Sequence, residues 1–168
     1  IKNLKPLWVV KLPNANKVRS QPTFAGGLLF VGSHGGGVYA LDQKTGCQVW
    51  YFKTVAEVRS GVSVDIWSND ATDSDPKIYF GDLIGNVYAL SAKTGALIWR
   101  DRADNHPSAT ITGAPALNDG VLYVPVSSLE VVLAVNPLYE CCTGRGSVVA
   151  YDANTGERLW QTYTVPEL

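Results

Sequence analysis

The sequence predicts an all-β protein made of four-stranded antiparallel β-propeller blades, because one phrase recurs three times along it. The phrase occupies residues 40–50, 89–99 and 150–160, and every copy begins with Ala, carries Thr-Gly in its middle and ends with Trp. A period of roughly 40–50 residues with Gly and Trp at fixed places is typical of propeller blades. One repeat cannot bury its apolar face alone, so neighbouring repeats are expected to stack on one another.

The elements follow from the residues around each phrase. Short runs rich in Val, Tyr, Leu and Trp alternate with Gly-rich turns, which predicts strands and hairpins rather than helices. We expect one partial propeller domain over residues 1–168, with blades at about 20–54, 60–103 and 110–163. Segment 5–12 resembles only the last strand of a blade, and we expect it to be an orphan strand of a further blade.

Composition argues against two classes of partner. The chain has 168 residues, 46% of them hydrophobic, which is enough for one sizeable core. Its formal net charge is −1 and it has no basic stripe, which argues against a nucleic-acid partner. There is also no run of about 20 apolar residues, so the sequence predicts no membrane span.

Two insertions interrupt the regular repeats. The polar stretch 67–77 is interpreted as a solvated turn, because its Asp spacing does not fit an EF-hand calcium loop. The stretch 129–144 is apolar and carries an adjacent cysteine pair near its end, and long loops of unusual composition are often functional. His34 and His106 stand in turn contexts, and we interpret both as surface residues.

The recurring phrase resembles the tryptophan-docking motif of the quinoprotein alcohol dehydrogenases, which are eight-bladed propellers that use pyrroloquinoline quinone (PQQ) and a divalent metal. The resemblance covers nearly the whole chain. Within that family it is similar to the polyvinyl-alcohol dehydrogenases in the stretches 45–50, 110–115 and 140–152. The resemblance implies oxidation of a secondary or polymeric alcohol, an electron acceptor such as a cytochrome c, and a periplasmic or secreted location.

The resemblance also implies a set of site residues. Thr112 and Ser127 are expected to contact the quinone, and Glu130 to bind the metal, which we expect to be Ca²⁺ because a hard cation prefers oxygen ligands. Arg59 is expected to pair with a quinone carboxylate through its planar guanidinium, and Arg145 is a second candidate for that task. From the residues alone, each arginine is equally an ordinary surface arginine and Glu130 a solvated loop carboxylate.

Three positions depart from the family pattern. Ser128 and Leu129 stand where the family has Gly and Ala, and both add bulk beside the expected cofactor. Arg19 stands where the family often has a cofactor-side acid, so one expected contact is missing or inverted in charge.

Cys141 and Cys142 form the sharpest feature of the sequence. Adjacent cysteines bond to each other only by closing an eight-membered ring, and in the resembling dehydrogenases that ring covers one face of the quinone. The resemblance therefore implies a cofactor-binding role and an oxidising compartment. The alternative is a pair of reduced intracellular thiols.

Two functions remain open from sequence. The first is part of a PQQ- and calcium-dependent alcohol dehydrogenase that is incomplete as a catalyst, because the family's general base lies in later blades. The second is a non-catalytic propeller module for protein interaction. In either case we expect the isolated chain to self-associate, because an open array of blades leaves apolar faces without a neighbour.

Overall fold

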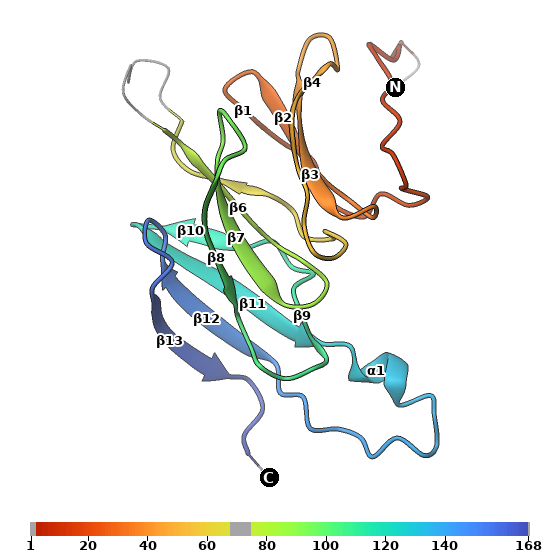
Figure 1. Cartoon of the computed structure of the whole chain (residues 1–168), viewed down its shortest axis with the longest axis vertical. Coiled ribbons are helices and arrows are strands. Elements are labelled where there is room, and N and C mark those ends of the chain that lie inside the picture. Colours follow the sequence, from red (N-terminus) through yellow and green to blue (C-terminus); the bar gives the residue numbers. More distant parts are fainter. Residues whose placement is uncertain (1–2, 68–74, 168) are drawn as a thin grey trace.

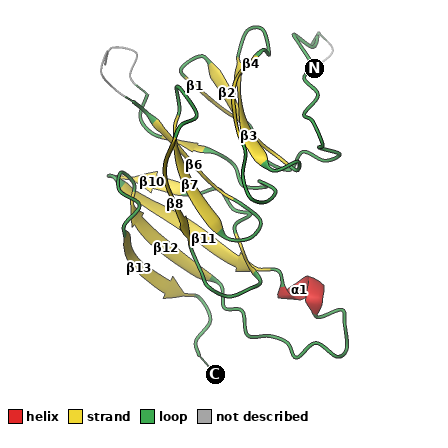
Figure 2. Cartoon of the chain, in the orientation of Figure 1, coloured by secondary structure: helices red, strands yellow, loops and turns green. Residues whose placement is uncertain are grey.

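The computed structural model describes residues 3–67 and 75–167, and it consists of three antiparallel sheets joined in sequence (Figures 1 and 2). The first sheet contains β1 (Thr23–Ala25), β2 (Leu28–Ser33), β3 (Gly37–Asp42) and β4 (Gln48–Phe52). The second contains β5 (Ser63–Val64), β6 (Lys77–Gly81), β7 (Asn86–Ser91) and β8 (Leu97–Arg102). The third contains β9 (Ala109–Thr110), β10 (Ala116–Asn118), β11 (Val121–Ser128), β12 (Ser147–Asp152) and β13 (Arg158–Tyr163).

The sheets stack face to face and do not close into a ring, so the predicted partial propeller is confirmed (Figure 1). One core cluster lies between the first two sheets and includes Phe30, Val38 and Phe80. A second lies between the second and third sheets and includes Val87 and Leu122. β7 is buried along nearly its whole length because the second sheet is covered on both faces by the other two sheets. β3 of the first sheet is equally buried, because Trp8 and Leu12 cover the face that the second sheet does not. Most of the polar insertion, residues 68–74, lies outside the described residues.

Each docking tryptophan contacts the next sheet in the same way, as the repeated phrase predicts. The Trp99 indole N–H donates to the carbonyl oxygen of Ala153 at 3.0 Å, and its ring lies against Gly156. Equivalent hydrogen bonds join Trp8 to Gln43 and Trp50 to Ala92, at 3.1 and 3.0 Å. The rings of these two tryptophans lie against the corresponding glycines of the next phrase, Gly46 and Gly95.

The two ends of the array differ from its middle. Segment 5–12 forms no strand in the structure, although Trp8 still docks on the first sheet. A strand needs a neighbour for its backbone groups, and the described residues include no fourth sheet to provide one. At the other end, Trp160 is 45% exposed, whereas Trp50 and Trp99 are 8% and 9% exposed.

The third sheet carries the feature that positions the candidate site. β11 pairs with β10 and β12 over its first part and with the short β9 at its end, where Ser127 lies opposite Thr110. Beyond it the chain forms the single-turn helix α1 (Glu130–Leu133) and a long loop that projects from the end of the sheet (Figure 1). Within the described part of the chain, no helix is long and apolar enough to cross a membrane.

The docking contact predicts a specific cost for adding one methyl group. Gly156 and Gly120 have the same positive φ of 76°, but a Cβ on Gly156 would lie 2.6 Å from the Trp99 ring, while a Cβ on Gly120 would meet nothing within 4 Å. Gly120→Ala should therefore cost only the left-handed backbone penalty, roughly 1–2 kcal/mol. Gly156→Ala should add roughly 1–3 kcal/mol of overpacking. Urea unfolding of both variants measures the difference, and equal midpoints would contradict the docking contact.

Candidate functional site

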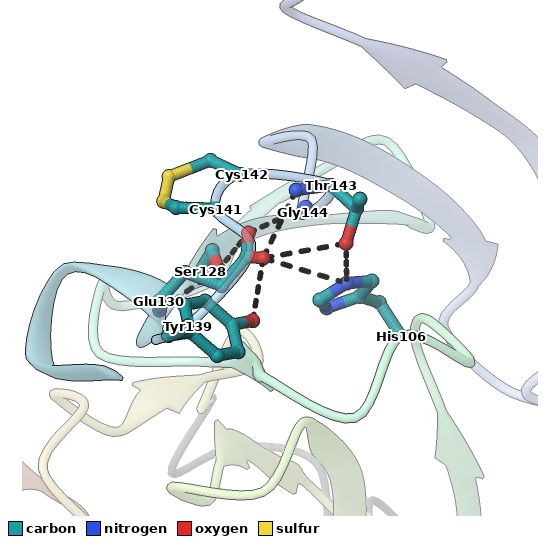
Figure 3. The surroundings of a disulfide bond; sticks show 8 residues. All are labelled: His106, Ser128, Glu130, Tyr139, Cys141, Cys142, Thr143 and Gly144. Atoms are coloured by element: carbon teal, nitrogen blue, oxygen red, sulfur yellow. Dashed lines mark hydrogen bonds and ion pairs between the residues drawn. A yellow bond between two sulfur atoms is a disulfide. The ribbon is translucent and has the colours of Figure 1, made fainter. Parts of the chain in front are cut away.

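A buried carboxylate lies at the end of β11, where α1 begins. Glu130 is 2% exposed, and its two oxygens accept hydrogen bonds from four residues (Figure 3). Oε1 accepts from the Tyr139 hydroxyl at 2.8 Å, and from the Thr143 backbone N–H and hydroxyl at 3.0 and 3.3 Å. Oε2 accepts from the Ser128 hydroxyl at 3.3 Å and from the Gly144 N–H. Glu130 is thus not a solvated loop residue but the centre of a hydrogen-bond network.

The environment of this carboxylate favours its charged form. Burial alone raises the pKa of Glu130, but the hydrogen bonds from Thr143, Tyr139 and Gly144 and the proximity of His106 more than offset that effect and lower it to about 2. The carboxylate therefore accepts hydrogen bonds as an anion at neutral pH, and hydrogen bonds to a charged group are stronger than those between neutral groups.

His106 joins the same network from the loop between β8 and β9, so it is not the surface residue expected from its turn context. Its Nε2 lies 3.0 Å from the Thr143 hydroxyl and 4.0 Å from Glu130 Oε1. Its Nδ1 accepts the Ser108 N–H at 3.2 Å. A neutral imidazole accepting at Nδ1 carries its proton on Nε2, so in that form His106 donates to Thr143.

Cys141 and Cys142 are joined in a disulfide, on the segment that Glu130 binds. Both residues are exposed, and Figure 3 shows their ring just beyond the carboxylate. The next two residues, Thr143 and Gly144, are the ones whose N–H groups reach Glu130. The disulfide is therefore held at its C-terminal side by the buried anion.

Arg59 lies on the segment that leads into β5, and its guanidinium group is paired with the carboxylate of Glu57. Nε and Nη2 donate to the two oxygens of Glu57 at 2.8 and 2.9 Å. His34 Nε2 lies 3.7 Å from the same carboxylate. Burial raises the pKa of Glu57, but the hydrogen bonds from Arg59 more than compensate and hold it below its ordinary value.

Arg59 also lines an open pocket of about 400 Å³ between the second and third sheets. The other lining residues come from the turn after β6, from the connection between β8 and β9, from the end of β11 and from α1, and they include Leu83, Ser108, Leu129 and Val132. The bulk added by Leu129 is thus accommodated in the pocket wall.

Thr112 occupies in the third sheet the position that Arg59 occupies in the second. The first strands of the three sheets pair in the same register: Thr23 with Phe30, Ser63 with Tyr79 and Ala116 with Tyr123. Arg19, Arg59 and Thr112 each precede their strand by the same number of residues. The family residues expected at the cofactor therefore lie at equivalent points of neighbouring blades, and Thr112 and Ser127 are both exposed.

Arg145 is engaged away from these positions. Its guanidinium lies over the Tyr163 ring, 4.2 Å from the centroid, and its Nε donates to the Val165 carbonyl oxygen at 2.8 Å. It shares with Cys142 a pocket of about 250 Å³. The structure therefore brings Arg145 and Cys142 together but places Arg59 in a different pocket, and neither pocket includes Thr112 or Ser127.

Sequence reasoning missed the partners rather than the central residues. Glu57 could have been identified from sequence as a partner of Arg59. It stands two positions earlier, and alternate residues of an extended segment point to the same side. Tyr139 and Thr143 gave no signal, since they reach Glu130 across a loop without periodicity. His106 gave none either, because it comes from a different connection.

Comparison with known proteins agrees with the repeated phrase. A family model described as "Outer membrane protein assembly factor BamB" matches residues 3–136 and again residues 59–167. Polyvinylalcohol dehydrogenases from a Pseudomonas species and from Sphingopyxis sp. (strain 113P3) are 38% and 35% identical over 98% and 99% of this chain. The crystal structure of quinohemoprotein alcohol dehydrogenase ADHIIG from Pseudomonas putida HK5 superposes with a TM-score of 0.72 over 93% of the chain, at 31% identity.

The chain spans 25% of each polyvinylalcohol dehydrogenase and 22% of the superposed structure. The match covers nearly the whole length of this chain, both in sequence and in its fold. The chain therefore belongs to the quinoprotein alcohol dehydrogenase family, within the propeller-repeat proteins that the BamB model also covers.

Proposed function

We propose that this chain is part of a PQQ-dependent alcohol dehydrogenase that oxidises a secondary or polymeric alcohol. The observation that carries the proposal is the exposed Cys141–Cys142 disulfide, held by the buried Glu130 at the end of β11. The identity with the polyvinylalcohol dehydrogenases supports it. Because the chain spans a quarter of those relatives, the activity of the whole protein is part of the proposal.

The residue types of this chain suit parts of a quinone site, although they lie in separate places in this structure. Arg59 supplies a partly exposed cation on an open pocket, Thr112 and Ser127 supply exposed hydroxyls, and the disulfide supplies a compact apolar surface. A guanidinium suits a carboxylate because its planar fork binds two oxygens at once. Glu57 occupies the Nε and Nη2 edge of this guanidinium and orients it, which leaves the outer Nη hydrogens for a ligand carboxylate. When bound, the quinone supplies the acceptor for the two electrons removed from the alcohol.

Calcium fits this chain less well. The resemblance assigns Glu130 as its ligand, yet the two oxygens of Glu130 face N–H and O–H donors from its own chain. A cation there would face protons rather than lone pairs. In residues 3–67 and 75–167, no group of three or more His, Cys, Asp or Glu side chains could hold a metal. The described residues therefore do not fit a calcium ion.

The remaining parts of the proposal concern the whole protein. Alcohol oxidation needs a base that takes the hydroxyl proton, and we propose that it comes from outside this chain, as does the binding surface for an electron acceptor such as a cytochrome c. A periplasmic or secreted location would suit the exposed disulfide, because such bonds persist in oxidising compartments. The alternative, a non-catalytic interaction module, shares the docking motifs but gives no reason for the disulfide.

Binding of PQQ alone, without metal, tests the quinone site. The chain should bind PQQ weakly, and Arg59→Gln should lower the affinity about tenfold or more, because a charge-assisted hydrogen bond is lost. Equilibrium dialysis with detection of quinone absorbance measures both. Arg100→Gln, which removes an exposed arginine on β8, is the matched control. Equal affinity of the two variants would remove Arg59 from the site.

We also propose that the isolated chain self-associates through the open face of β13. Leu159, Trp160 and Tyr163 on this last strand are 49%, 45% and 42% exposed, and exposed large apolar side chains favour association. Light scattering over a dilution series should show assemblies that Trp160→Ser weakens. Ile66→Ser, which removes an apolar side chain that is 88% exposed elsewhere, should have no effect. A wild-type monomer at every concentration would contradict the proposal.

A further inference from the structure

The segment that carries the cysteine pair has few packing contacts to hold it in place. Between α1 and β12 the chain runs without a strand, and Val135 and Leu138 on it are 82% and 91% exposed. Such a segment buries little apolar surface, so packing contributes little to its order. Its order must come from polar contacts instead.

Those contacts converge on one carboxylate. Tyr139 reaches Glu130 through its hydroxyl, just before the cysteine pair. Thr143 and Gly144 reach it through their backbone N–H groups, just after the pair. The disulfide is therefore bracketed by residues bound to the same anion (Figure 3).

The glycine and the histidine fit this arrangement. A Cβ on Gly144 would collide with Glu130 Oε2 and with the Ser128 hydroxyl, so the absence of a side chain permits the close approach. His106 also contacts Thr143, with its Nε2 lying 3.0 Å from the Thr143 hydroxyl oxygen. The donors thus come from β11, from the long loop and from the connection after β8.

We propose that Glu130 is a positioning residue, whose buried carboxylate fixes residues 139–144 and so sets the place and orientation of the Cys141–Cys142 ring. This role differs from metal binding, because five hydrogen bonds already fill the roughly four lone-pair sites of the carboxylate. It does not rest on the proposed activity, since every consequence is measurable on this chain alone.

Hydrogen exchange gives the direct test. In Glu130→Gln one carboxylate oxygen becomes an NH₂ group, which cannot accept from the Thr143 or Gly144 N–H that it faces, and the remaining oxygen is a weaker, uncharged acceptor. Exchange at these two amides should rise about tenfold or more, because charge-assisted bonds are lost. The amides of β12, which lie outside this segment, should exchange as in the wild type.

The disulfide provides a chemical readout that a general loss of stability would not mimic. Its rate of reduction by dithiothreitol, counted as thiols above the exposed Cys47, should rise about tenfold in Glu130→Gln, following the opening of the segment. Glu140→Gln is the matched control, because it removes an exposed negative charge directly beside Cys141. It should change the rate little, which separates anchoring from simple charge removal.

A second variant and a calcium titration provide further tests. Should Glu130→Gln not fold, Tyr139→Phe removes a single donor and should raise exchange within 139–144 to a smaller extent. Addition of CaCl₂ should not raise the wild-type melting temperature. Unchanged exchange and reduction in the variants would overturn the proposal, and so would a calcium-induced rise in melting temperature that Glu130→Gln abolishes.

Discussion

The contact between each docking indole and the glycine of the next sheet sets the spacing of the whole array. Trp99 illustrates its two components, a hydrogen bond to the Ala153 carbonyl and a ring that lies against Gly156. The hydrogen bond fixes direction and the ring fixes distance, because any Cβ at the glycine would separate the sheets. Within the sheets, β1, β5 and β10 each pair with the next strand in the same register. That register places Arg59 and Thr112 at equivalent positions of neighbouring blades.

The parts of the fold that depend on local residues were predictable from sequence. The docking phrase contains its own turn, its strand and the tryptophan that reaches the next sheet, so three copies were enough to predict three sheets. Segment 5–12 shows the limit, because a strand requires partners that its own residues do not specify. Trp8 docks correctly while its backbone forms no strand. Side-chain docking and strand formation are therefore separable in this chain.

The candidate site was predictable as a set of residue types but not as a geometry. The arginine was expected to face a ligand carboxylate, yet in this chain it binds Glu57. Arg19, where the family pattern has an acid, contributes to lowering the pKa of that same carboxyl. The negative charge beside Arg59 thus comes from its own segment, two residues earlier, and not from position 19 of the preceding blade. The contribution of Arg19 was not readable from sequence, because charges from different blades combine only after stacking.

The burial of Glu130 couples one carboxylate to the order of a long loop. A buried carboxylate without donors is costly, and here the loop supplies most of the donors, through Tyr139, Thr143 and Gly144. Removal of the loop would leave the anion unsatisfied, and removal of the anion would leave those loop donors without an acceptor. Each part therefore stabilises the other, and the disulfide lies on the stretch between the donors. This mutual dependence explains why a glutamate that the family pattern assigns to a metal is so fully hydrogen-bonded within its own chain.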